Sequence, residues 1–200
     1  MTPDVLAPFA LAAALAAAAG LRFYGVVFFV GFLGSLGVIQ LPGDLQLLTH
    51  PAIVVTSGVL FAFEFLADKV PLVDSLWDLI NTFVRIPGGA LLAALALANQ
   101  DSGMVAAAAL LGGLLAGGTH VAKMGTRATL NLSPEPVSNW LASFAEDGLG
   151  IGLLVLALAY PLGFLGVFVL LLIALVWLLS KVAGAGLRLI RRRTIVGNSN

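Results

Sequence analysis

Many ionisable residues of this chain lie inside long apolar segments, where a charged side chain is costly. Only 10% of the 200 residues are charged, and 60% are hydrophobic. A charged group in the middle of a membrane helix costs about 2.5–3.5 kcal/mol on insertion scales, so such groups usually bind, pair or conduct. The candidate substrate-binding or ion-binding residues are therefore Arg22, Glu64, Lys69, Asp74, Asp78, Arg85, His120, Lys123, Glu146 and Asp147.

Two polar helical faces with the same spacing contain several of these candidates. In each face four polar residues follow one another at intervals of 4, 4 and 3, which places them on one side of a helix. The second face lies 61 residues after the first, and the two sets are Asp74, Asp78, Thr82, Arg85 and Glu135, Asn139, Ser143, Glu146. The match predicts an internal duplication, inverted or parallel in the membrane. If the units face each other, Arg85 meets Glu146 or Asp147, either in a binding site or in an ion pair that fastens the halves.

Glycine and proline follow each polar face and predict a break in both helices. The first stretch has Pro87, Gly88 and Gly89, and the second has three alternating glycines that begin at Gly148. A helix that restarts within the membrane presents free N–H groups that attract anions. Paired broken helices in two repeats are typical of a transporter's binding site. Gly88, Gly89 and Gly148 are thus candidate binding residues, and the alternative is two ordinary kinked helices that span the bilayer.

For the remaining candidate residues, a structural role is weighed against a role in the binding site. Glu64 and Lys69 either mark the end of a membrane segment or enter the cavity. Arg22 and Lys123 lie deep enough in long segments to line a path. His120 alone is more typical of a packed, hydrogen-bonded histidine than of a proton relay.

The sequence contains no motif that is typical of an enzyme. The chain has no cysteine, and its two histidines, His50 and His120, lack metal-ligand spacing. No serine stands in a nucleophile elbow, and no glycine-rich phosphate loop follows a strand. The basic residues are too few for a nucleic-acid-binding face. We expect no enzymatic activity, no metal, no cofactor and no nucleic-acid partner.

Membrane-inserted helices must position these residues. The mean hydropathy is +1.07, and apolar stretches of about 20 residues, the length that crosses a bilayer, recur along the chain. We predict an all-α, polytopic integral membrane protein with about six membrane-inserted segments, including discontinuous or re-entrant helices. It forms a single transmembrane domain over residues 1–193, with repeat halves of about 5–98 and 104–190, and a polar tail over 194–200. Residues 5–39 are too many for one straight span, so we expect a tilted or kinked helix near Gly20 and Gly25.

The distribution of basic residues predicts the orientation. Lys181 and four arginines from Arg188 to Arg193 follow the most apolar segment, whereas residues 40–50 and 99–102 include neither Lys nor Arg. By the positive-inside rule the C-terminus is cytoplasmic. The apolar N-terminal run lacks the basic residues that precede it in a signal peptide, so we expect a retained first helix.

A long run of residues carries a resemblance to a known family. It extends from Glu64 to Asp78 and is accompanied by the segments 19–24, 50–51, 82–85, 89–92 and 133–139. In these residues the chain resembles the bacterial membrane family catalogued as domain of unknown function 4126, over most of residues 10–160. The resemblance implies a membrane location and no particular activity. Ile86 departs from the family pattern, in which proline is expected directly after the arginine.

These observations favour a small membrane transporter that moves a small polar or anionic solute, or a lipid head group. Its charged site would lie at the interface of two broken-helix repeats. The alternatives are an oligomeric ion channel and a non-transporting membrane scaffold or assembly protein. Since 200 residues provide few helices to enclose a pathway, we expect a homodimer or higher homo-oligomer. It would contact membrane lipids in the bacterial inner membrane.

Overall fold

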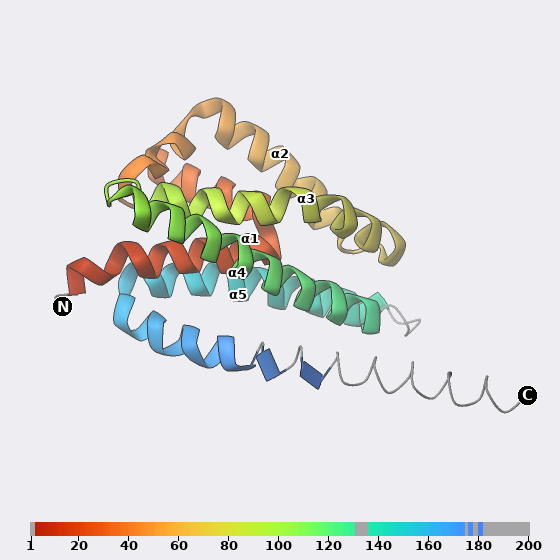
Figure 1. Cartoon of the computed structure of the whole chain (residues 1–200). Coiled ribbons are helices and arrows are strands. Elements are labelled where there is room, and N and C mark those ends of the chain that lie inside the picture. The colour runs from red at the N-terminus through yellow and green to blue at the C-terminus, as the bar shows by residue number, and fades with distance from the viewer. Residues whose placement is uncertain (1–2, 131–135, 175, 178–179, 182–200) are drawn as a thin grey trace, which may run out of the picture. The chain divides into compact units, whose positions relative to one another are not determined.

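The described part of the protein is entirely helical (Figure 1). The computed structural model describes residues 3–130, 136–174, 176–177 and 180–181. The four arginines of the predicted basic tail, Glu135 and the side chain of Asn139 lie outside the described residues. The helices are α1 Pro3–Ser35, the 3-10 helix η1 Gly43–Thr49, α2 Pro51–Ala67, α3 Pro71–Ala96, α4 Ser102–Leu130, α5 Pro136–Ala159 and a further helix at Pro161–Ala174. The chain divides into two compact units, Met1–Leu165 and Gly166–Asn200, and the site lies in the first.

Several of these helices are long and apolar enough to cross a bilayer. Four pass this test, at Leu6–Ser35, Val73–Ala96, Ser102–Leu130 and Trp140–Ala159, and the pair η1 and α2, bent by 72°, brings the number to five. The all-helical prediction is confirmed, and such helices are typical of a multi-pass membrane protein. Six segments and an internal repeat stay predictions.

Five of the described helices begin with a proline. These prolines are Pro3, Pro51, Pro71, Pro136 and Pro161. Proline is favoured there because its missing N–H would have no partner and its φ already suits the helix. At α2, His50 adds a side-chain cap, since its Nδ1 accepts a hydrogen bond from the backbone N–H of Ala52 at 3.3 Å.

Helix α1 breaks at Arg22, whose backbone angles (φ −147°, ψ 76°) are not helical. The chain doubles back at this point (Figure 1). Before the break Ala16 lies beside Gly89 of α3, and after it Phe23 packs against Gly88, at the same level. The kink expected between Gly20 and Gly25 is confirmed, and it turns α1 into two arms that meet at Arg22.

The first arm of α1 is the buried centre of the bundle. Its alanines at 10, 14, 16, 18 and 19 have no exposed surface. Such small side chains let neighbouring helices approach closely. At Gly20 the approach is closest, because a Cβ there would overlap the backbone of Ala116 and the side chain of Thr119 in α4.

Helices α3 and α4 form an antiparallel hairpin along a strip of small residues. Gly89 faces Ala116, and Gly112 faces Ala93. Small residues at these positions let the two helix backbones approach closely. It brings the polar half of α3 against the polar half of α4.

The predicted breaks in α3 and α5 are wrong, because both helices are continuous. An unpaired backbone group in lipid costs several kcal/mol, so a helix there persists through residues that would end it in water. Gly88 and Gly89 instead let α3 pack against Phe23 and Ala116. Gly148 is exposed, and a Cβ there would have no neighbour within 4 Å.

Candidate functional site

A buried polar face of α3 forms one side of the site. Asp74, Asp78, Asn81 and Arg85 recur at helical spacing, and each is at most 2% exposed. The predicted face is therefore observed for Asp74, Asp78 and Arg85. Thr82, the fourth predicted member, is half-buried and reaches α4 instead.

The facing helix α4 contributes His120, Lys123 and Arg127, all of them buried. They lie three and four residues apart and so share one helical face. His120 and Lys123 were predicted site residues, whereas Arg127 was not. The signal for Arg127 was available, because it stands one helical turn after Lys123.

Arg85 connects α2, α3 and α4 through its side-chain contacts. Its guanidinium lies 2.6 Å from Glu64 and 2.7 Å from Asp78, and its Nη1 lies 2.9 Å from His120 Nδ1. The predicted pairing of Arg85 with Glu146 or Asp147 is replaced by these contacts. The cation of α3 pairs with a carboxylate of α2 because Glu64, near the end of α2, reaches the buried face of α3.

The same contacts fix the state of His120. An arginine can only donate, so Nδ1 of His120 must accept, and the ring is neutral with its proton on Nε2. That Nε2 lies 2.8 Å from the hydroxyl of Thr82, which in turn donates to the carbonyl of Asp78 at 3.0 Å. His120 is thus the packed, hydrogen-bonded histidine that the sequence favoured.

Asp68 is the centre of a second group of ion pairs. It has no exposed surface, and its Oδ2 lies 2.7 Å from Arg22, 3.3 Å from Lys123 and 3.5 Å from Arg127. Burial alone would raise the pKa of this carboxyl, but the charges of Lys123, Arg22 and Arg127 outweigh it and lower the pKa below its usual value. Asp68 was not a predicted site residue, although it stands four residues after Glu64.

Helix α5 packs against α1 and contributes further polar residues to the network. Glu146 receives two hydrogen bonds from Arg127, at 2.9 and 3.0 Å. Asp147 pairs with Arg22, and Ser143 accepts a hydrogen bond from Arg22 at 2.7 Å. The kinked α1 therefore bridges α5 and the turn between α2 and α3.

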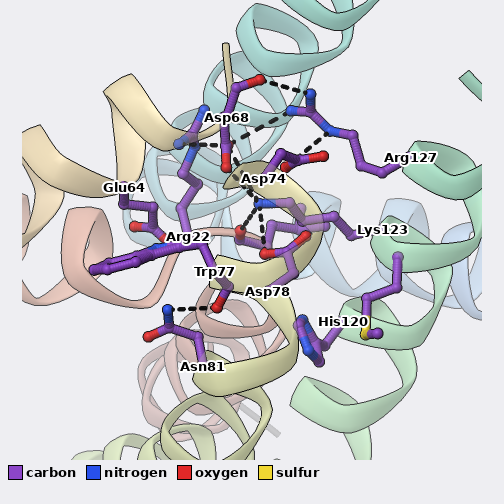
Figure 2. A network of polar contacts seen from close by, with 12 residues as sticks. Arg22, Glu64, Asp68, Asp74, Trp77, Asp78, Asn81, His120, Lys123 and Arg127 are labelled. Carbon is purple, nitrogen blue, oxygen red and sulfur yellow. Dashed lines mark hydrogen bonds and ion pairs between the residues drawn. The ribbon is translucent and has the colours of Figure 1, made fainter. Parts of the chain in front are cut away.

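Figure 2 shows how side chains from α1, α2, α3 and α4 and from the turn between α2 and α3 converge. Lys123 Nζ lies 3.3 Å from oxygens of both Asp68 and Asp78. An ammonium thus already fills the place where a metal ion would bind these two carboxylates.

Four predicted residues lie at the edge of this network or outside it. Gly88 and Gly89 pack against helices, and Gly148 faces outward. Lys69 lies in the turn after α2, where its Nζ is 3.0 Å from the centroid of the Phe65 ring. Burial, with the nearby charge of Arg22, lowers the pKa of Lys69.

A cavity of about 210 Å³ opens beside the Arg22 break. Two charged residues, Arg22 and Asp147, stand at its polar end, and the other lining residues are Gly25, Val26, Phe29, Phe61, Gly150, Ile151 and Leu154. Apolar walls with a few polar groups are typical of small-molecule sites. This cavity fits a small solute with an apolar body and one polar or charged group.

Comparison with known proteins places the chain in a family. A model of the family described as domain of unknown function 4126 matches residues 9–181. The match covers most of the chain, and the chain belongs to this family. No curated protein and no solved structure is significantly similar to it. The family description names no activity.

Proposed function

We propose that this member of the family is a small transporter that moves a polar or anionic solute, or a lipid head group, across the membrane. The supporting observation is the position of Arg22, which stands at the backbone break of α1 and at the polar end of the cavity. Intramembrane charges beside a backbone break are typical of transporter sites.

Arg22 has the contacts that solute exchange requires. It pairs with Asp68, which is fully buried, and with Asp147, whose side chain is 19% exposed. An anionic group that enters the cavity competes with Asp147 for the guanidinium, whose donor geometry matches both carboxylate and phosphate. Asp68 holds Arg22 in place while Asp147 and the solute exchange.

We further propose a bacterial inner-membrane location with a cytoplasmic C-terminus and assembly into a homodimer or higher oligomer. The loops beside α1 and between α3 and α4 contain Asp44 and Asp101 and no Lys or Arg, whereas Lys69 lies in the turn at the opposite end of α3. This bias supports the orientation by the positive-inside rule. The few helices available to enclose a path support assembly.

A second candidate is a non-transporting membrane assembly role. One observation favours it, which is that Arg22, Arg85, Lys123 and Arg127 all form ion pairs with carboxylates. Such a network fastens helices without needing a solute. The cavity beside Arg22 favours transport.

Flux in liposomes separates the two candidates. Purified protein would be reconstituted and tested for movement of fluorescent phosphatidylglycerol between leaflets and of acetate and phosphate across the bilayer. We expect wild-type protein to accelerate at least one of them. Arg22→Lys should slow that flux about tenfold or more, since a hydrogen bond between charged groups contributes about 1.5–3 kcal/mol.

Asp44→Asn is the matched control, because Asp44 is exposed outside the network. It should transport like the wild type. Wild-type liposomes that match protein-free liposomes for all three probes would favour the assembly role. Full flux in a folded Arg22→Lys protein would remove Arg22 from the mechanism.

A further inference from the structure

The interior network holds more negative than positive groups. Its cationic members are Arg22, Arg85, Lys123 and Arg127, and its carboxylates are Glu64, Asp68, Asp74, Asp78, Glu146 and Asp147. His120 is neutral, as its hydrogen bonds show. With every carboxylate ionised, the network would carry two uncompensated negative charges. Uncompensated buried charge is strongly unfavourable, so such groups neutralise.

Among these carboxylates, the negative charge of Asp74 is the least neutralised by nearby cations. It has no exposed surface, and neither of its oxygens has a hydrogen-bond partner. Its ion-pair contact is Arg127 Nε, at 4.0 Å. By contrast, cationic atoms lie 2.7 Å from Asp68 and from Asp78.

Carboxylates also crowd Asp74. One oxygen each of Asp68, Asp74 and Asp78 lie within 4.8 Å of one another. Two carboxylates at such a distance favour a proton on one of them. The charged groups that face Asp74 are Asp78 on its own helix, Asp68 from the preceding turn, Lys123 and Arg127 from α4, and Glu146 from α5.

We propose that Asp74 binds a proton and is the proton-exchange group of this protein. The proton adds to one carboxylate oxygen from water and leaves to water by the same route. Asp74 lies in the first turn of α3, at the end of the bundle where the α2–α3 turn lies, so the route is short.

The ion pairs connect this proton to the cavity. Loss of the proton leaves a charged Asp74 that attracts Arg127 away from Asp68 and Glu146. Asp68 then depends more on Arg22, its other arginine partner. A stronger Asp68–Arg22 ion pair weakens the ion pair between Arg22 and Asp147 at the cavity. Proton exchange and solute exchange are thereby coupled; this coupling rests on the proposed function, whereas proton binding does not.

Infrared difference spectra of the protein in lipid bilayers test the proton site. The wild type should show the C=O band of a carboxylic acid that is lost at alkaline pH and shifts in D₂O. Asp74→Asn should lose this band, and Asp74→Glu should keep it at a shifted position. The exposed carboxylate variant Asp44→Asn should match the wild type.

A wild-type spectrum without the band, or a folded Asp74→Asn protein that retains it in full, overturns the proposal. Folding of each variant is checked by circular dichroism and gel filtration. Liposome flux under a pH gradient then tests the coupling separately. A band that depends on Asp74 in a protein without flux would sustain the proton site and reject transport.

Discussion

Asp68 illustrates how single residues hold this interior together. Arg22, Lys123 and Arg127 come from α1 and α4 and converge on its side chain, and Arg127 also donates to its backbone carbonyl at 3.1 Å. A buried carboxylate that neutralises several cations is costly to remove, because each cation then lacks a partner.

Asp68→Asn should therefore destabilise the protein by about 3–5 kcal/mol, the usual cost of breaking a buried ion pair. Thermal unfolding in detergent, with Asp44→Asn as the control, measures the difference. An equal melting temperature in both variants would contradict the assignment.

The pH dependence of this loss follows from the lowered pKa of Asp68. A carboxyl with a lower pKa in the folded state stabilises the protein above its unfolded-state pKa, and this contribution is lost as pH falls through the folded-state pKa. The destabilisation by Asp68→Asn should stay constant from about pH 5 to about pH 8 and shrink only in more acidic solution.

The sequence identified most of these residues but could not pair them. Asp74, Asp78 and Arg85 were found because their spacing is helical and their chemistry is unusual in an apolar segment. Their partners depend on how α2 and α4 pack against α3, which spacing along one helix does not determine. Arg85 was therefore matched with the wrong carboxylates.

At the scale of the helices, the break in α1 shows what interrupts a helix in lipid. Pro87 and Gly88 are strong breakers in water, yet α3 continues through them. Arg22 is an ordinary helix former, yet the helix breaks there, where its guanidinium contacts both Asp68 and Asp147. Local propensity placed a break wrongly in α3, where the cost of unpaired backbone groups in lipid keeps the helix continuous.

The glycines of α1 and α5 should respond oppositely to the same substitution. Gly20→Ala should destabilise the protein by about 1–3 kcal/mol, since its Cβ would overlap the backbone of α4. Gly148→Ala, with no neighbour within 4 Å, should be neutral or stabilising by up to about 1 kcal/mol, because alanine favours the helix.

Unfolding in detergent compares the two variants, and flux in liposomes adds a second readout. Gly148→Ala should leave flux unchanged if α5 is continuous. A loss of flux in that variant, with stability intact, would restore the break that the sequence predicted.

At the scale of the whole bundle, the doubled-back α1 determines which segments share a side of the membrane. Its two arms point to the end of the bundle where η1 packs, and there Gly43 lies against the backbone of Leu95 near the end of α3. A predominantly apolar helix of 30 residues would otherwise be assigned as one crossing. Composition alone does not reveal the reversal.

Cysteine labelling tests this reversal directly, since the native chain has no cysteine. Ala7→Cys, near the start of α1, and Val38→Cys, just after its end, should react with an impermeant thiol reagent from the same side of the membrane. Val70→Cys, in the turn after α2, should react from the other side. Labelling of positions 7 and 38 from opposite sides would show that α1 crosses once.

The doubled-back helix has a consequence for topology. If α1 enters and leaves the membrane on one side and each helix from α2 to α5 crosses once, an even number of crossings precedes Tyr160. Residue 3 and Tyr160 would then share a compartment, and α3 and α5, separated by one pass, would point the same way. If α3 and α5 arose by duplication of one segment, both copies would have the same orientation in the membrane. A tandem duplication produces this arrangement without an inversion of topology.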